Sequence, residues 1–433
     1  MAGHVQVESL PSNVLAVEVA PRRTSWFAAA CLCLFSAWYF ALVIAPSGLG
    51  PSSPTFQQGL LPEWIGCREV LRGRDPYRAE VMRQAQSGIY GQNGPIGAAP
   101  NQHRFAYPAF FVFLFFPIAL LPLEIAQLVM LAVCVLLWTL SLRLWLSMAD
   151  FHELDRLTFA VLAFASYPVI LALQLRQPTL MIFAMLSLAV FWARSGRLVW
   201  AGIAGALGTC KPHLAIAVLL PLTIWSLVSW RTRKAFLLSL SATLFALLMA
   251  SSLLVPGWLF EWLGTLRAYT RYAGATPLFA ELLQGHFVFP AAALLVLAIV
   301  WMSFAFCDED LLFAISFSVV AFQMLFQFQI YNEVLLLPAT LWAAINAAVI
   351  RRRGQLPDLL SDCAWTALGS GWAATVALSA WDMASPGSGV KLWQLPLIAA
   401  WLYPMLLFAA LAVFAASSLL ARYRAQRADR ITA

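Results

Sequence analysis

Hydrophobic positions dominate this chain in long uninterrupted runs. The runs near residues 26–45, 125–146, 235–255 and 397–420 each approach or exceed the roughly 20 residues that span the hydrocarbon core of a bilayer. Segments in lipid must satisfy their own backbone hydrogen bonds, and continuous rather than alternating apolar runs favour helices over a barrel. The pattern predicts an all-α polytopic membrane protein with about 11 transmembrane helices.

A long polar segment, residues 46–107, separates the first two apolar runs. It is much longer than an ordinary helix connection, which makes it a functional candidate. Within it, apolar residues recur at helical spacing and charged residues fill much of the opposite surface, which predicts a helix lying in the membrane interface. The apolar positions are Leu60, Leu61, Trp64, Cys67 and Leu71, and the charged ones are Glu63, Arg68, Glu69 and Arg72. We expect Gly73 to end this helix and Asp75 to cap a second one starting at Pro76.

Charge then sets the orientation. Only 11% of the residues are charged and the net charge is +7, but the basic residues form short separate clusters, which argues against nucleic-acid binding and places those clusters on the cytoplasmic side. The clusters are Arg22–Arg23, Arg194 with Arg197, Arg231 to Lys234, Arg351–Arg353 and Arg422 to Arg430. We therefore expect cytoplasmic tails at 1–25 and 422–433, one transmembrane domain at 26–421, and an extracytoplasmic loop at 46–107.

This alternation depends on two ambiguous segments. Residues 110–121 would not cross the membrane fully, and residues 199–229 would form two short segments hinged at Lys211–Pro212. The rival arrangement makes each a simple span but places Arg194 and Arg197 outside.

Carboxylates in the polar loop are candidate general bases. Glu63, Glu69, Asp75 and Glu80 all lie there. The alternative is that each one only solvates the outer face of an interfacial helix.

Three cations, Arg104, Arg176 and Lys211, lie at or near membrane depth, where a charge is costly and normally faces a cavity or a partner. Pro212 breaks the helix directly after Lys211, and irregular backbone at that depth is tolerated where it lines a cavity. The combination indicates a pocket for an anionic group such as phosphate. The alternative for Lys211 is a side chain that extends from a helix end to the interface.

Other polar residues are weaker candidates. Tyr331, Asn332 and Glu333 could hydrogen-bond sugar hydroxyls, although an ordinary polar helix start has the same pattern. Asp308 and Asp310 are more simply read as helix caps than as a metal or nucleotide-sugar site. The seven cysteines form no disulfide framework and no metal site is predicted; no cofactor is expected.

Several blocks together resemble glycosyltransferase family 87. They are "LRGRDPY" in the polar loop, "FAYPAFFVFLFFPIALLP", the stretch from "LQLRQPT" through "GTCKPH", and the late "IYNEVLLLPATL". The similarity extends over about residues 25–420 and lies in the joint order of the blocks. It implies a GT-C-type bundle that uses a polyprenyl-phosphate sugar, mannose-like or arabinose-like, on the extracytoplasmic side of a bacterial plasma membrane.

The resemblance also implies roles for individual residues. An acid early in the outer loop would deprotonate the acceptor, which is a lipid or a glycan. Gly59 stands where an aspartate is expected, so Glu63, and failing that Asp75, is the candidate base. Phosphate contacts fall to Lys211, Arg176 and Arg104, and sugar or acceptor contacts to Gln177, Tyr107, Tyr331 and Asn332. In some relatives a histidine stands at the position of Tyr331–Asn332.

Two rival functions follow from the same residues. A transporter or flippase of a lipid-linked saccharide often has broken helices at matching positions in two halves, and only the break at Lys211–Pro212 is seen. A catalytically inactive homologue is the alternative that Gly59 raises.

Overall fold

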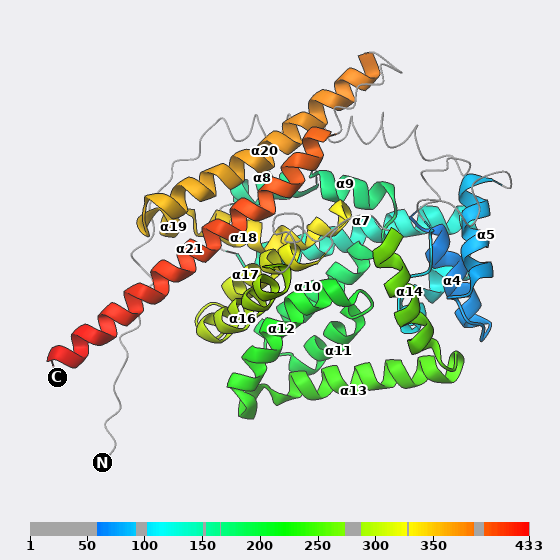
Figure 1. Cartoon of the computed structure of the whole chain (residues 1–433), viewed down its shortest axis with the longest axis horizontal. Coiled ribbons are helices and arrows are strands. Elements are labelled where there is room, and N and C mark those ends of the chain that lie inside the picture. Colours follow the sequence, from blue (N-terminus) through cyan, green and yellow to red (C-terminus); the bar gives the residue numbers. More distant parts are fainter. Residues whose placement is uncertain are drawn as a thin grey trace.

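The computed structural model describes residues 59–91, 102–149, 153–164, 166–272, 287–326, 329–384 and 394–432, and in these ranges it contains helices and no strand (Figure 1). The expected first span at 26–45 lies outside the described residues. The helices are α4 (Leu61–Leu71), α5 (Ala79–Tyr90), η2 (Ala109–Phe111), α6 (Val112–Ala119), α7 (Leu123–Ser147), α8 (Glu153–Phe164), α9 (Tyr167–Gln174), α10 (Thr179–Arg194), α11 (Leu198–Gly208), α12 (Pro212–Val228), α13 (Trp230–Leu254), α14 (Trp258–Tyr272), α16 (Val288–Phe306), α17 (Leu311–Leu325), η4 (Ile330–Leu336), α18 (Leu337–Ile345), α19 (Ala347–Arg352), α20 (Gln355–Ala384) and α21 (Gln394–Thr432).

The helices confirm the predicted class but leave the number of spans open. Four described helices are long and apolar enough to cross a membrane, and the bent pair α8–α9 makes a fifth. Six further apolar helices have only 10–17 residues. The count of about 11 spans therefore stays a prediction.

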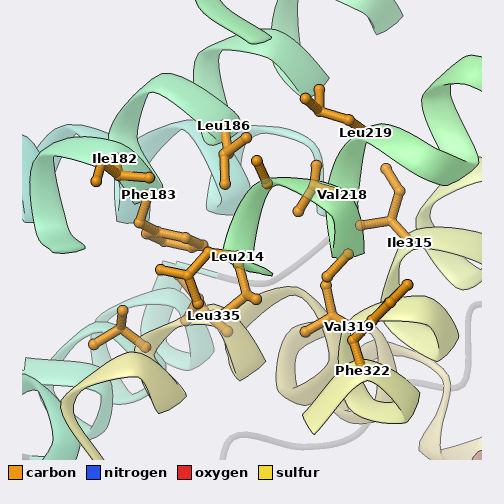
Figure 2. Packing of buried hydrophobic residues seen from close by; sticks show 14 of the residues in the cluster. Ile182, Phe183, Leu186, Leu214, Val218, Leu219, Ile315, Val319, Phe322 and Leu335 are labelled. Atoms are coloured by element: carbon orange, nitrogen blue, oxygen red, sulfur yellow. The ribbon is translucent and has the colours of Figure 1, made fainter. Parts of the chain in front are cut away.

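The core of the bundle lies where α10, α12 and α17 meet. In Figure 2, Ile182, Phe183 and Leu186 of α10 face Leu214, Val218 and Leu219 of α12, while Ile315, Val319 and Phe322 approach from α17 and Leu335 from η4. In lipid there is no hydrophobic driving force between helices, so close van der Waals packing of these large side chains holds the helices together. Residues from four separate segments are thereby held at fixed positions around the start of α12.

Helices α10 and α11 form a tight hairpin whose turn includes Gly196, at φ +74°. Helix α11 then lies against α13 at a distance that only glycine permits, because a Cβ on Gly202 would lie 2.0 Å from Ser239 Oγ. The helical conformation is interrupted at residues 209–211, and Pro212 is the first residue of α12. Proline suits the first turn of a helix because the N–H that it lacks would have no partner within the helix. The 199–229 region is thus two short helices meeting at Lys211, as expected.

The acidic turn before α17 is joined by ion pairs to the first turn of α13 and to α21. Arg233 pairs with Asp308 at 2.5 Å and Arg422 pairs with Glu309. The Asp310 carboxylate accepts a hydrogen bond from a backbone N–H in the first turn of α17. The interpretation of Asp310 as a helix cap is confirmed, whereas Asp308 forms an ion pair instead.

The outer helices α4 and α5 pack against each other at one end of the molecule, where α4 also contacts α6 (Figure 1). Helix α4 ends at the predicted glycine: Gly73 has φ +67°, its N–H donates to the Val70 carbonyl at 2.9 Å, and the Arg74 N–H donates to the Glu69 carbonyl at 2.8 Å. These two hydrogen bonds give partners to backbone carbonyls of the last helical turn, which would otherwise have none.

Two details of this region differ from expectation. Helix α5 begins at Ala79 rather than Pro76, because the Asp75 carboxylate accepts from the Tyr77 N–H at 2.9 Å and closes a local turn instead of capping a helix. Leu71, expected on the buried face of α4, is 41% exposed, whereas Val70 is buried.

Candidate active site

Lys211 lies in the break between α11 and α12 with its side chain turned into the bundle. The residue is 8% exposed. Its Nζ donates to Thr179 Oγ1 at 2.6 Å and to Asn332 Oδ1 at 2.8 Å, and the Thr179 hydroxyl donates to the same Asn332 oxygen at 3.0 Å. An ammonium has three N–H donors, so one remains for a further acceptor.

Two aromatic rings accompany these hydrogen bonds. Lys211 Nζ lies 4.9 Å from the centre of the Tyr331 ring and 5.7 Å from that of Tyr107. The faces of aromatic rings attract a cation at this range, most strongly where water is excluded. The predicted residues Tyr107, Lys211, Tyr331 and Asn332 are therefore brought together from three separate segments, although their chemical roles remain predictions.

Glu63 is directed toward the same region from the outer helix α4. Its Oε2 atom is buried and has no hydrogen-bond partner in the described parts of the chain. Burial raises the pKa of Glu63 to about 8, while a backbone hydrogen bond and the Lys211 charge act in the opposite direction. Glu63 and Lys211 thus interact electrostatically without forming an ion pair.

The other carboxylates of the outer loop have partners of their own. Glu69 pairs with Arg72 at 2.6 Å, and the exposed Glu80 pairs with Arg83 at 2.7 Å. Asp75 is half-buried and is occupied by the turn described above. These contacts fit the solvating and structural interpretations, so the geometry favours Glu63 among the acids.

The backbone leading into Tyr107 is fixed by side chains from two directions. The Tyr77 hydroxyl donates to the Tyr107 carbonyl at 2.9 Å, and Trp262 Nε1 of α14 donates to the Ala106 carbonyl at 2.9 Å. Buried carbonyls with partners of this kind hold one conformation.

Helix α5 holds the start of the same segment. Gln86 Nε2 donates to the Gln102 carbonyl at 3.1 Å, and the Tyr90 hydroxyl lies 2.8 Å from His103 Nε2. His103 has φ +48°, a conformation costly for a residue with a side chain and maintained only where the surroundings enforce it. We call residues 102–107 with these contacts the anchored segment.

The two arginines predicted to bind phosphate have structural contacts. Arg176 is 1% exposed, has φ +50°, and donates to the carbonyls of Gln127 at 3.3 Å and Gln174 at 2.8 Å, which joins α7 to the α9–α10 turn. Arg104 is half-buried and its Nε donates to Gln102 Oε1 at 2.7 Å. Their roles at phosphate remain predictions.

Gln177 is buried beside Arg176. Its backbone carbonyl accepts a weak bond from the Cys134 thiol at 3.7 Å. Whether its side chain contacts a sugar stays a prediction.

The structure leaves no room for a side chain at position 59. A Cβ there would lie 2.0 Å from the Leu175 carbonyl oxygen, far inside any contact distance. An acid at this position would require the backbone to move, whereas Glu63 lies one turn further along.

Thr179 belongs to the site but was not predicted. It follows Pro178 at the start of α10 and is fully buried. A single hydroxyl at the start of an apolar helix carries no specific signal, because such residues are ordinary in helix first turns.

Comparison with known proteins places these features in a family. Among the described residues, no group of three or more His, Cys, Asp or Glu could hold a metal ion. No curated protein shows significant similarity to the chain. The sequence profile of glycosyltransferase family 87 matches residues 105–327, just over half of the 433 residues, and the match includes Tyr107, Thr179 and Lys211. The chain belongs to glycosyltransferase family 87.

Proposed function

We propose that this membrane glycosyltransferase takes its sugar from a polyprenyl-phosphate donor and transfers it to a hydroxyl of a lipid or glycan acceptor. The single observation that carries the proposal is the geometry of Lys211. A buried ammonium with two neutral hydrogen-bond partners, two aromatic faces and one remaining donor suits a phosphate oxygen. In a site that excludes water, such a cation interacts with an anion much more strongly than in solution.

The reaction needs a base and a stabilised leaving group. The acceptor oxygen bonds to the anomeric carbon of the sugar while the bond from that carbon to the phosphate oxygen breaks. Glu63, when ionised, takes the proton of the acceptor hydroxyl. The departing polyprenyl phosphate keeps the electron pair, and Lys211 compensates the charge that develops on it. Attack on the face opposite the leaving group inverts the anomeric centre.

The arrangement of charges supports an extracytoplasmic site in a GT-C-type bundle. Lys211 precedes the first residue of α12, and Arg233 lies beyond its last, donating to the Trp225 carbonyl at 2.9 Å. The 17 residues of α12 separate these ends by about 25 Å. Because basic clusters favour the cytoplasm, the Lys211 end with α4 and α5 is assigned to the opposite side.

Cysteine reporters test that orientation. We expect an impermeant thiol reagent to label Glu80→Cys in intact cells and to label Gly354→Cys only after the membrane is opened, with the unmutated chain as the background. Labelling of both from the same side would contradict the assignment.

The activity is tested with purified full-length protein and a panel of polyprenyl-phosphate sugars. We expect transfer from at least one donor, and Lys211→Ala should reduce turnover about a hundredfold or more, the range seen when one group that stabilises transition-state charge is removed. Lys211→Arg should restore only part of it, because a guanidinium differs in shape and hydration.

Circular dichroism and gel filtration of both variants show whether the fold is kept. A folded Lys211→Ala protein with normal turnover would remove the phosphate assignment. If the unmutated protein transfers no sugar from any donor, the inactive alternative is supported.

A further inference from the structure

A cavity lies on the other side of η4 from Lys211. Its volume is about 290 Å³, and it is bounded by α7, α8, α9, the η4–α18 segment, α20 and α21. Most of its wall is apolar and includes Trp138, Phe159 and Trp365. An engineered apolar cavity of roughly 150 Å³ holds a benzene molecule, so this one has room for a larger apolar group.

Three hydroxyl groups on the wall, those of Ser166, Thr340 and Tyr403, already have hydrogen-bond acceptors. Ser166 Oγ and Thr340 Oγ1 donate to backbone carbonyls of their own helical turns at 2.8 and 3.0 Å. Tyr403 lies 2.5 Å from Thr340 Oγ1. Because the single Thr340 hydrogen is used, Tyr403 is the donor in that bond.

Glu333 differs from these neighbours. Its carboxyl lines the cavity, and nothing in the described part of the chain donates a hydrogen bond to it or pairs with it. A carboxyl in an apolar wall without a partner is costly, and the cost falls when a ligand supplies a hydrogen-bond donor.

Glu333 is also one residue from the Lys211 site. Successive residues of a 3₁₀ helix are about 120° apart around the axis. Asn332 accordingly reaches Lys211 at 2.8 Å, while Glu333 faces the cavity. The two sites therefore lie on different faces of the same turn of η4.

We propose that this cavity binds a neutral lipid-like molecule that carries a hydroxyl group, and that Glu333 is the hydrogen-bond partner of that hydroxyl. A hydroxyl can donate to a carboxylate or accept from a carboxylic acid, so the pair is satisfied in either protonation state. An ammonium would need three acceptors, which the largely apolar wall does not provide. The site does not depend on sugar transfer beside Lys211.

The test uses two photoreactive probes, a diazirine-bearing decanol and the same chain without the hydroxyl, on the full-length protein in detergent. Labelled peptides are identified by mass spectrometry. We expect the alcohol to label the peptides that contain Phe159 and Trp365 about tenfold more than the alkane, the ratio that one hydrogen bond to a carboxyl gives. Unlabelled 1-decanol should compete and decane should not.

Matched variants separate the hydroxyl contact from the cavity itself. Glu333→Leu should remove the preference for the alcohol, while Glu333→Gln, which can still hydrogen-bond, should keep most of it. Gly369→Leu should reduce labelling by both probes, because Gly369 lines the cavity and a Cβ there meets no atom within 4 Å. Gly264→Leu on α14 is equally unobstructed, lies outside the cavity, and should change nothing.

Equal labelling by the two probes, or a Glu333→Leu protein that keeps the preference, would overturn the proposal. The source of the natural ligand is tested by adding the panel of polyprenyl-phosphate sugars. A sugar found on the alcohol probe identifies the cavity as the acceptor site. Labelling without sugar identifies a bilayer lipid as the ligand, and both results support the site.

Discussion

The rate of transfer should depend steeply on pH between pH 6 and pH 9, because the proposed base holds its proton at neutral pH. Burial raises the pKa of Glu63 to about 8, and only the ionised carboxylate can accept a proton. The pH dependence of kcat/KM reports the pKa values of the free enzyme. The polyprenyl-phosphate donor is a phosphodiester, which does not titrate in this range.

The size of the effect follows from the fraction of ionised Glu63. With a pKa of about 8, roughly 1% is ionised at pH 6, about half at pH 8 and about nine-tenths at pH 9. We therefore expect kcat/KM to rise about tenfold per pH unit on the acid side as Glu63 ionises, and to fall at higher pH as Lys211, whose pKa burial lowers to about 7, loses its charge. Lys211 lowers the pKa of Glu63, so Lys211→Met should move the midpoint to higher pH in addition to slowing transfer.

The assay is the initial rate of sugar transfer at donor concentrations well below KM, measured across this range with the purified protein. A control incubation at each pH followed by assay at pH 8 detects inactivation. A profile that is flat, or that levels off near pH 5, would refute the assignment of Glu63 as a buried base. So would a Glu63→Gln variant with the profile of the unmutated protein.

Three further predictions concern residues around this site. Between about pH 4.5 and pH 8, Glu63 keeps its proton in the folded protein and loses it in the unfolded chain, so the free energy of unfolding falls by ~5 kcal/mol as pH rises through this window. Thermal melts should show Glu63→Gln more stable than the unmutated protein at pH 9 and similar to it at pH 4. The reverse order would contradict this. Gly59→Asp should lower the melting temperature and fail to increase transfer, because its Cβ would lie 2.0 Å from the Leu175 carbonyl oxygen; a stable and more active variant would show that the backbone yields there. Asp75→Asn should retain transfer within about threefold, since an amide oxygen can still accept the Tyr77 N–H; complete loss in a folded variant would make Asp75 the base.

Much of the site was predictable because polar residues are rare in an apolar chain. Lys211 followed by proline, and the Tyr331–Asn332 pair at the start of an apolar segment, were conspicuous from composition alone. The cost of an unpartnered charge in lipid predicted a pocket at Lys211, and the structure adds Tyr331 and Asn332, which were separate candidates, as contacts of its ammonium. The end of α4 at Gly73 was also predictable from the sequence, because a helix end at glycine depends only on the local backbone conformation.

What could not be predicted depends on contacts between distant segments. No local pattern places the Leu175 carbonyl against Gly59, and none indicates that Arg176 would use its guanidinium on backbone carbonyls of α7 and α9. Thr179 became part of the site through Lys211 and Asn332, which lie 32 and 153 residues away in the sequence. The number of spans was obscured for a related reason, because several apolar helices are short and supported by neighbours rather than by lipid.

The anchored segment makes the outer helices and the charge on Lys211 mechanically dependent on each other. Tyr77 and helix α5 hold this backbone from one side and Trp262 holds it from another, while the Tyr107 ring it carries rests over the ammonium. A displacement of α5 would therefore move the Tyr107 ring as well, and would weaken one of the two aromatic contacts of the Lys211 ammonium.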